Sequence, residues 1–348
     1  MTEFDIPVPD ESARTAAQDR LDGLVKPVGA LGRLEELAAW LAAAHGSVPP
    51  RELEDVRVVV FAGDHGVTRA AGSGVSAYPR EVTAAMVRAF LSGISGVNVL
   101  AGQVGARVGV VDIAVDDDLD GVPEAVARHK IRRGSGSIDS EDALSPGEAR
   151  RAFDAGLRIA DEAVDAGAQL LIPGDMGIGN STVAATLVAA SLGLPAGEVV
   201  GTGTGVDEAG LSGKTAVVDA ALRRAGDRAS DPFDLLTALG SGCAAATAGF
   251  VLGGARRAVP VLLDGVFSCA AALVAHDIAP EAARWWLAGH RSTEPSQAFA
   301  LKTLGLEPIL DLGLRLGEGS GAVQAVPTLR AARAVLAGMG SLADLDIG

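Results

Sequence analysis

The sequence is poor in cysteine and in aromatic residues. It contains two cysteines, Cys243 and Cys269, and only 3% of its 348 residues are Phe, Trp or Tyr. Both cysteines stand in apolar, alanine-rich surroundings, which predicts buried reduced thiols, and no spacing is typical of a zinc site. The shortage of aromatic side chains also disfavours a protein that stacks nucleobases on aromatic platforms.

Positive charge is scarce as well. The chain has 29 Lys and Arg residues against 44 Asp and Glu residues, a net charge of -15. Such a surface disfavours binding to nucleic acid or to anionic membranes. The acidic N-terminus lacks the apolar core of a signal peptide, and the longest apolar runs contain Gly, Pro, Asp or Arg and fall short of a membrane span. We therefore expect a soluble cytoplasmic protein.

What the sequence does contain is a strand, a glycine-rich loop and a helix start between residues 169 and 192. Residues 169–172 predict a buried parallel strand, and Gly174, Gly177 and Gly179 follow it. Asn180 is predicted to cap the next helix. Backbone N–H groups and the helix dipole at such a junction favour a phosphate, but glycines also occupy these turns for geometry alone. Both interpretations stay open from the spacing.

A second glycine-rich turn, GTGTGVD at residues 201–207, includes Gly203 and precedes Lys214 in a predicted helix. One lysine near two glycine-rich loops is a candidate partner for a phosphate. Asp175 lies in the first loop, where a carboxylate would repel a phosphate. We therefore expect Asp175 to face a different, positively charged part of the ligand.

Other candidate residues lie at loops elsewhere. Asp64 and His65 follow a strong strand, so His65 is either a catalytic base or part of a stabilised turn. Tyr78, the only tyrosine, is a candidate wall for a flat ring. Glu318 stands between two glycines in GEGSG, where it is either a general base on a closely approaching loop or a helix cap.

Strands alternate with helices along the chain. Apolar runs predict strands at residues 56–61, 108–113, 169–172, 199–200 and 259–264. This alternation predicts an α/β fold, a doubly wound and mainly parallel sheet with helices on both faces. We expect one functional unit over residues 1–348, with a large sheet domain at 51–285 and a smaller helical part from 1–50 and 286–348.

Seven segments resemble the signatures of one known family. They are FAGDHGV, VSAYPREVT, PGDMGIGNST, GTGTGVD, VPVLLDG, GHRSTEP and LEPILDLGLRLGEGSGA. They are similar to motifs of the nicotinate-nucleotide–dimethylbenzimidazole phosphoribosyltransferases and keep the family's order across nearly the whole chain. The resemblance implies a doubly wound parallel sheet with a small helical domain, and it implies a homodimer.

The resemblance also implies a reaction. The family transfers the phosphoribosyl group of nicotinate mononucleotide to 5,6-dimethylbenzimidazole, giving α-ribazole 5′-phosphate and nicotinate for the nucleotide loop of cobalamin. Glu318 matches the catalytic carboxylate that removes the benzimidazole proton. Asp175 is then expected to stabilise the positive transition state. No metal ion and no cofactor are expected, because the donor carries no diphosphate.

The remaining expected contacts are with the two substrates. Gly177, Gly179 and Lys214 are expected to hold the 5′-phosphate, and Tyr78 and Leu316 to line the benzimidazole pocket. The other substrate-binding residues that we expect are Gly174, Asn180, Gly203 and Ser292.

The chain departs from the family pattern at several positions. Asp175 stands where the family usually has Glu, Ala85 where it has a Gln in the base pocket, and Cys243 where it has a carboxylate. Two alternatives therefore stay open. One is the same reaction with another base as acceptor, and the other is a nucleotide-binding protein without turnover.

Overall fold

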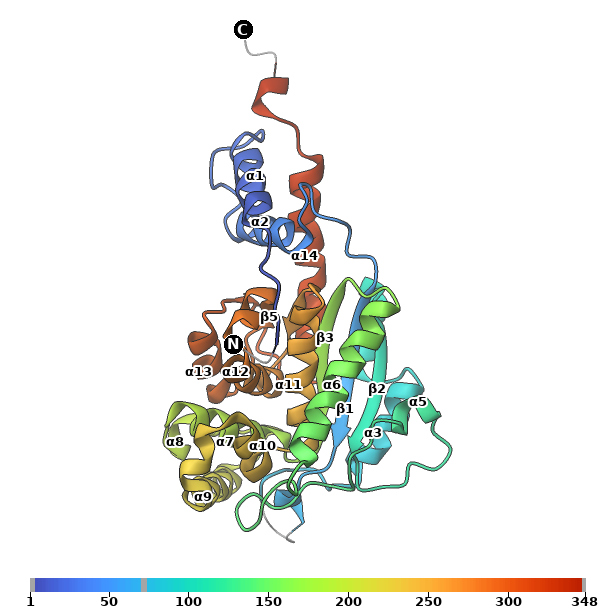
Figure 1. The fold of residues 1–348 in the computed structure, drawn as a ribbon, viewed down its shortest axis with the longest axis vertical. Helices are drawn as coiled ribbons and strands as arrows, with labels where there is room; N and C mark the ends of the chain where they lie inside the picture. The colour runs from blue at the N-terminus through green and yellow to red at the C-terminus, as the bar shows by residue number, and fades with distance from the viewer. Residues whose placement is uncertain (1–3, 70–73, 346–348) are drawn as a thin grey trace.

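Six parallel strands form one sheet at the centre of the molecule (Figure 1). The computed structural model describes residues 4–69 and 74–345. The strand order is β2-β1-β3-β4-β5-β6, so the direction of winding reverses between β1 and β3. The bounds are β1 Val56–Gly63, β2 Arg107–Ala114, β3 Leu170–Met176, β4 Val261–Leu263, β5 Trp286–His290 and β6 Pro308–Leu310.

Helices connect and cover these strands. The α-helices of the described residues are α1 Glu11–Asp22, α2 Arg33–His45, α3 Val82–Leu91, α4 Gly96–Val104, α5 Glu124–Ala127, α6 Glu148–Asp165, α7 Asn180–Leu192, α8 Ala196–Val199, α9 Glu208–Ala225, α10 Pro232–Leu239, α11 Gly242–Arg256, α12 Val266–Ile278, α13 Pro295–Leu304 and α14 Ser320–Gly338. Short 3-10 turns lie at η1 Gly66–Thr68, η2 Gly226–Ser230, η3 Pro280–Trp285 and η4 Leu342–Asp344.

Strand β1 has a hydrophobic core on each side, because successive side chains of a strand point to opposite faces. Val59 and Phe61 belong to a core that includes residues of α6, α7, α11 and α12. Val58 and Val60 belong to a second core that includes residues of α2, α3, α4 and α14. Helices therefore cover both faces, and the predicted doubly wound α/β fold is confirmed.

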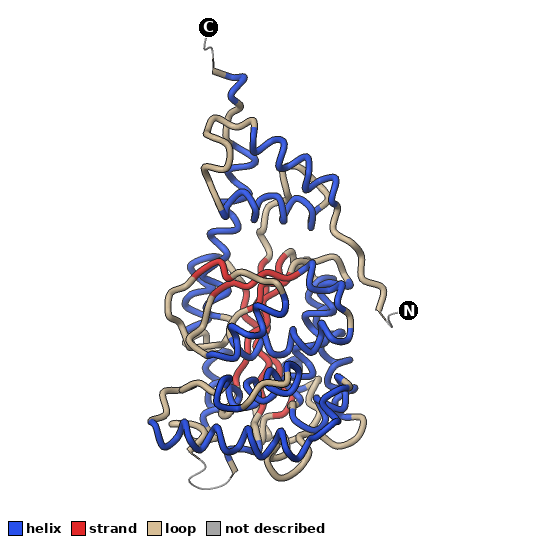
Figure 2. Tube along the Cα trace, turned by 90° about the vertical axis from the view of Figure 1, so that its left-hand side faces the viewer, coloured by secondary structure: helices blue, strands red, loops and turns tan. Residues whose placement is uncertain are grey.

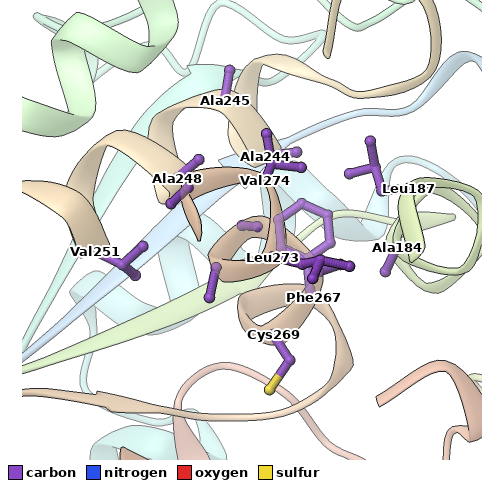
Figure 3. Close-up of a cluster of buried hydrophobic side chains, with 14 of the residues drawn as sticks. Ala184, Leu187, Ala244, Ala245, Ala248, Val251, Phe267, Cys269, Leu273 and Val274 are labelled. Carbon is purple, nitrogen blue, oxygen red and sulfur yellow. The ribbon is translucent and has the colours of Figure 1, made fainter. Parts of the chain in front are cut away.

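Small side chains let the helices on one face pack closely. Alanine side chains of α7 and α11 surround Phe267 and Leu273 of α12 (Figure 3). A Cβ at Gly249 of α11 would lie 2.0 Å from the backbone oxygen of Phe153 in α6. The high alanine and glycine content of the sequence thus allows the helices to pack closely. Both cysteines are buried and free, as predicted.

The strands differ from the prediction in two places. Val199 and Val200 were predicted as a strand, but Val199 ends helix α8. Residues 286–348 were assigned to the helical part, but this range contains β5 and β6, which extend the sheet beyond β4. All five residues of β5 are buried, as expected for an inner strand of a parallel sheet. We therefore propose that the sheet domain continues to β6.

The helical unit consists of α1, α2 and the C-terminal half of α14 and stands at the top of Figure 2. It joins the two ends of the chain. Val25 N–H donates to the Gly340 carbonyl at 2.9 Å, and Leu342 N–H donates to the Gly23 carbonyl at 2.9 Å. The Arg20 guanidinium donates to the Leu336 carbonyl at 2.7 Å. Helix α14 begins at the sheet and ends in this unit, so it links the two parts.

One helical segment of the described residues, Val82–Val104, is long and apolar enough to cross a membrane by length and composition. The expectation that no run reaches a membrane span was therefore wrong on this criterion. The segment consists of α3 and α4, which are separated by Ser92–Ser95, and both helices contribute to the second core. A buried helix of a globular protein passes the same test, so this is weak evidence.

Candidate active site

A cavity of about 90 Å³ lies where the carboxyl ends of β3 and β5 meet the loop before α14. Ligands of open α/β sheets bind at this edge. Predicted site residues that line the cavity are Asp175, Asn180, Gly203, Ser292 and Leu316. A larger hollow of about 780 Å³ lies between the helical unit and the sheet domain, but none of the predicted site residues lines it. We therefore place the site at the smaller cavity.

Glu318 lies beside this cavity on a left-handed turn. Gly317, Glu318 and Gly319 have φ angles of 78°, 66° and 93°. The Glu318 side chain is buried, and its Oε2 accepts the Val97 N–H at 3.2 Å. Burial raises the pKa of Glu318, the Val97 N–H opposes this rise, and the nearby Asp264 adds to it. The result is a carboxylate that takes up a proton more readily than an exposed one.

Asp175 is the second-last residue of β3 and lines the cavity. Burial raises its pKa to about 7, with a further rise from Asp264 and, more weakly, from Glu318. The Asn180 side-chain amide donates to its Oδ2 and opposes this rise. Because Asp175 and Glu318 repel each other, a cation between them would stabilise both charges. The cavity thus suits a positively charged centre.

The three glycines of the first loop serve close packing. A Cβ at Gly174 would lie 2.3 Å from the Glu318 carbonyl oxygen, and one at Gly177 would lie 2.1 Å from the Gly63 oxygen. Gly179, with φ of 93°, is the residue that caps α7, so the prediction that Asn180 is the cap was wrong by one position. Asn180 starts the helix, and its Oδ1 accepts the Ser181 N–H at 2.7 Å. The geometric interpretation of these glycines is therefore supported.

The second glycine-rich turn contributes Gly203 and Thr204 to the cavity wall, whereas Lys214 does not line the cavity. Lys214 is fully buried, and its Nζ donates to the Gly201 carbonyl at 2.7 Å and to Ser181 Oγ at 3.1 Å. Desolvation lowers the pKa of Lys214, and the carboxylate of Glu294 partly restores it. Glu294 also accepts the Gly203 N–H at 2.7 Å. Lys214 thus lies behind Ser181 and Gly203, which line the cavity.

Comparison with known proteins places this arrangement in a family. A sequence model of a phosphoribosyltransferase family matches residues 6–347. A nicotinate-nucleotide–dimethylbenzimidazole phosphoribosyltransferase of Mycolicibacterium paratuberculosis is 55% identical over 339 residues, 97% of this chain and 96% of that protein. The enzyme of the same name from Mycobacterium tuberculosis is 53% identical over 342 residues, 98% of this chain and 93% of that protein.

The chain belongs to the nicotinate-nucleotide–dimethylbenzimidazole phosphoribosyltransferase family. A crystal structure of such an enzyme from Thermus thermophilus matches with a TM-score of 0.90 and 43% identity, over 96% of this chain and 98% of that one. A second crystal structure, of CobT from the same organism, matches with a TM-score of 0.91 and 44% identity, over 97% and 100% of the two chains.

The remaining predicted contacts of this family member lie at the rim. Tyr78 is more than half exposed and does not line the cavity, but Ala77 N–H donates to Thr204 Oγ1, which does. Leu316 lines the cavity and lies against Gly96, where a Cβ would be 2.7 Å from its Cδ2. Ser292 also lines it, and its Oγ accepts the Glu294 N–H at 3.3 Å.

His65 and Asp64 do not line the cavity, and His65 packs against the glycine-rich loop at Gly177. Burial lowers the pKa of His65 to about 4, so its ring is neutral at pH 7. The ring packs under Gly177, whose Cβ would be 2.8 Å from His65 Nε2. Asp64 accepts the Asp116 N–H at 2.8 Å. The interpretation of this pair as a stabilised turn is therefore favoured over a catalytic base.

Sequence reasoning missed several residues of this family member's site. Arg315 lines the cavity and donates to the Gly203 carbonyl at 3.1 Å, so it connects two loops across the opening. His290 and Phe267 line it from β5 and α12. Glu294 lies in the motif GHRSTEP and Arg315 in the motif LEPILDLGLRLGEGSGA. Their position in these family motifs could have identified both residues from the sequence. No three His, Cys, Asp or Glu side chains gather as a metal site requires within residues 4–69 and 74–345.

Proposed function

We propose that this chain transfers the phosphoribosyl group of nicotinate mononucleotide to 5,6-dimethylbenzimidazole, giving α-ribazole 5′-phosphate and nicotinate in the assembly of the cobalamin nucleotide loop. The observation that carries the proposal is the buried Glu318, which follows Gly317 of the cavity on a left-handed turn and interacts electrostatically with Asp175, a residue of the cavity wall. Relatives that are 53–55% identical over nearly the whole chain bear the name of this reaction.

The proposed mechanism needs one base and one charge stabiliser. A ring nitrogen of the benzimidazole attacks the anomeric carbon with its lone pair, from the face opposite nicotinate. The bond from that carbon to the pyridinium nitrogen breaks, and its electron pair neutralises the pyridine ring. Glu318 takes the proton from the other benzimidazole nitrogen. The anomeric configuration inverts from β to α.

Positive charge passes from the pyridinium to the ribose ring during this step. Asp175 faces the cavity and, once ionised, stabilises the oxocarbenium-like transition state electrostatically. The pyridine leaves as a neutral ring nitrogen, so no general acid is needed. The 5′-phosphate is held near Ser181 and Gly203, with the buried Lys214 behind them supplying positive charge.

The decisive experiment measures nicotinate release from nicotinate mononucleotide, with and without 5,6-dimethylbenzimidazole, and identifies the nucleotide product. Release that depends on the base and gives the α-nucleotide is the expected result. Glu318→Ala should slow the reaction strongly and leave binding of nicotinate mononucleotide nearly unchanged. Faster turnover with another base in competition would favour a different acceptor, and binding without release would favour a nucleotide-binding protein.

We also propose that the protein is a homodimer in the cytoplasm. Leu91, Ile94 and Val99 form an apolar patch on α3, α4 and their connection, with exposed fractions of 43%, 74% and 59%. Exposed apolar side chains grouped in this way favour a protein–protein contact. The patch adjoins Leu316 through Gly96, so a second copy bound there would lie beside the site. Light scattering after size-exclusion chromatography should give twice the mass of 35.0 kDa.

A further inference from the structure

The backbone that presents Glu318 is unusual. Three consecutive residues, 317–319, have positive φ, and Glu318 is the one that is not glycine. Within the described residues the other such non-glycine residues are Leu119 and Ala258, which stand outside the site. A left-handed conformation is unfavourable for a residue with a Cβ, so it persists only where surrounding contacts enforce it. Some group must therefore hold this turn.

The buried carboxylate of Asp264 holds it. Asp264 follows β4 and is fully buried. Its Oδ2 accepts the Gly319 N–H at 3.1 Å, and its Oδ1 accepts the Ala322 N–H at 2.8 Å. Helix α14 has glycine at its N-cap and no side-chain cap of its own. Asp264, 55 residues earlier in the chain than Gly319, thus supplies the cap and immobilises the residue next to Glu318.

Asp264 is itself held in place by the neighbouring strand. His290, the last residue of β5, has its Nε2 3.4 Å from Asp264 Oδ1. The Gln297 side-chain amide donates to the carbonyls of both Asp264 and His290, at 3.1 Å and 3.0 Å. A Cβ at Gly321 would lie 2.0 Å from the His290 ring, so the ring lies directly against the first turn of α14. The sheet, the histidine and the helix form one packed unit.

Asp264 also sets the electrostatics of the site. It raises the pKa of Glu318 and that of Asp175, while the Val97 N–H from α4 and the Asn180 amide from α7 act in the opposite direction. Asp264 also faces His290. Burial lowers the pKa of His290, but Asp264, the Arg291 backbone and, more weakly, Asp311 outweigh burial, so the pKa is raised. Removal of the Asp264 charge therefore makes Glu318 a weaker base.

We propose that Asp264, packed against His290, is the positioning residue that fixes the left-handed turn on which Glu318 reaches the substrate. Asp264 is fully buried and does not line the cavity, so it acts only through the turn and through its charge. The inference deepens the proposed function and rests on it.

The first test is Asp264→Asn, which keeps the shape and removes the charge. Each oxygen of the Asp264 carboxylate accepts a hydrogen bond from one backbone N–H group. In the variant the asparagine NH₂, itself a donor, would face one of these N–H groups, so the turn should relax. We expect kcat to fall roughly 100-fold, as for a misplacement of about 1 Å, with KM for nicotinate mononucleotide within about threefold. The acidic limb of the kcat profile should move to lower pH, because the pKa of Glu318 falls.

The matched control is Asp231→Asn. Asp231 caps α10 by accepting hydrogen bonds from the N–H groups of Phe233 and Asp234, both at 2.9 Å. The variant Asp231→Asn therefore changes the same kind of helix cap at a position that does not line the cavity. It should leave kcat and its pH profile unchanged. Equal kinetics for Asp264→Asn and wild type, or equal kinetic losses in both variants, would overturn the proposal.

A readout without turnover separates this inference from the proposed function. In a crystal structure of ligand-free Asp264→Asn, the Glu318 carboxylate should leave the Val97 N–H, and an unmoved Glu318 would overturn the inference. Failure of the wild-type enzyme to release nicotinate with any base would refute the proposed function alone. If Asp264→Asn is insoluble, His290→Asn should lower kcat roughly tenfold without moving the acidic limb to lower pH, because the Asp264 charge that raises the pKa of Glu318 remains. An unchanged kcat, or an acidic limb that moves to lower pH, would count against the proposal.

Discussion

Glu318 shows how a single residue is kept in an unfavourable state for function. Its backbone is left-handed, and its carboxylate is buried with a raised pKa. Each feature costs folding free energy, the first about 1–2 kcal/mol. Both features also serve the proposed base, since the turn places Glu318 directly after Gly317 of the cavity wall and burial strengthens the affinity of the carboxylate for a proton.

Glu318→Gly should therefore make the protein more stable and inactive. Glycine removes the backbone strain and the buried charge, so the free energy of unfolding should rise by about 1 kcal/mol. Urea unfolding followed by circular dichroism measures this change, and nicotinate release measures activity. Ala258→Gly, which relieves positive φ outside the site, is the control that should stabilise without a loss of activity. A destabilised Glu318→Gly variant would argue against strain at this turn.

The raised pKa of Asp175 predicts how stability depends on pH. The folded protein holds the proton up to about pH 7, whereas the unfolded chain releases it near 3.8. Between these values the unfolded state binds fewer protons, so the free energy of unfolding falls as pH rises and the penalty is complete above pH 7. Asp175→Asn should remove a penalty of about 2–4 kcal/mol at about pH 8 and little at about pH 4.

Calorimetric unfolding at the two pH values measures this effect. The exposed Asp120→Asn variant carries the same change of charge and should show no such pH-dependent gain. An Asp175→Asn variant that gains equal stability under the acidic and the alkaline condition would contradict a raised pKa.

At the scale of elements, glycine decides where segments approach each other. Gly249 of α11 lies against the Phe153 carbonyl of α6, and Gly174 of β3 lies against the Glu318 carbonyl. Gly102 of α4 is different, since a Cβ there meets nothing within 4 Å. Sequence spacing alone does not separate these cases, because the partner of each glycine is distant in the chain.

Two alanine substitutions test this distinction. Gly249→Ala should destabilise the protein by about 2–3 kcal/mol, because the new Cβ meets a backbone oxygen that cannot move freely. Gly102→Ala should stabilise it by about 0.5–1 kcal/mol, because it restricts the unfolded chain and fits the exposed helix. Thermal unfolding of both variants provides the comparison. Destabilisation of both by similar amounts would show that helix geometry, and not contact across helices, is decisive.

At the scale of the whole molecule, parallel strands bring distant residues to one edge. The ends of β2, β1, β3, β4 and β5 carry Asp112, Asp64, Asp175, Asp264 and His290, which are neighbours only because the strands stand in this order. Three of these carboxyls, Asp64, Asp112 and Asp175, have raised pKa values caused mainly by burial. The acidic edge and the net charge of -15 give the molecule a strongly negative field.

This charge predicts how the proposed homodimer responds to salt. Two copies that each carry -15 repel each other, while contact through Leu91, Ile94 and Val99 depends little on salt. The Kd of the dimer should therefore fall several-fold between about 20 mM and about 300 mM NaCl, as sedimentation velocity measures. Ile94→Ser should weaken the dimer at both concentrations. Dissociation caused by added salt would instead point to ion pairs across the interface.

The core strands and part of the candidate site were predictable because they depend on local patterns. The predicted site residues that line the cavity are Asp175, Asn180, Gly203, Ser292 and Leu316. Apolar runs marked the strands that became β1, β2, β3 and β4, and the motifs around Asp175 and Glu318 marked the site. The strand at residues 199–200 was wrong, because an apolar pair alone does not distinguish a strand from the end of a short helix such as α8. Tyr78 was expected in a pocket wall and lies exposed at the rim.

By itself the sequence determined the fold class and the family, because periodicity and motifs are properties of neighbouring residues. The tertiary structure alone decided that Asp264 caps the turn of Glu318 and that Lys214 is buried behind Ser181. It also decided that β5 and β6 complete the sheet. These facts depend on contacts between segments that are far apart in the chain, and burial, strain and pKa values arise only once those contacts have formed.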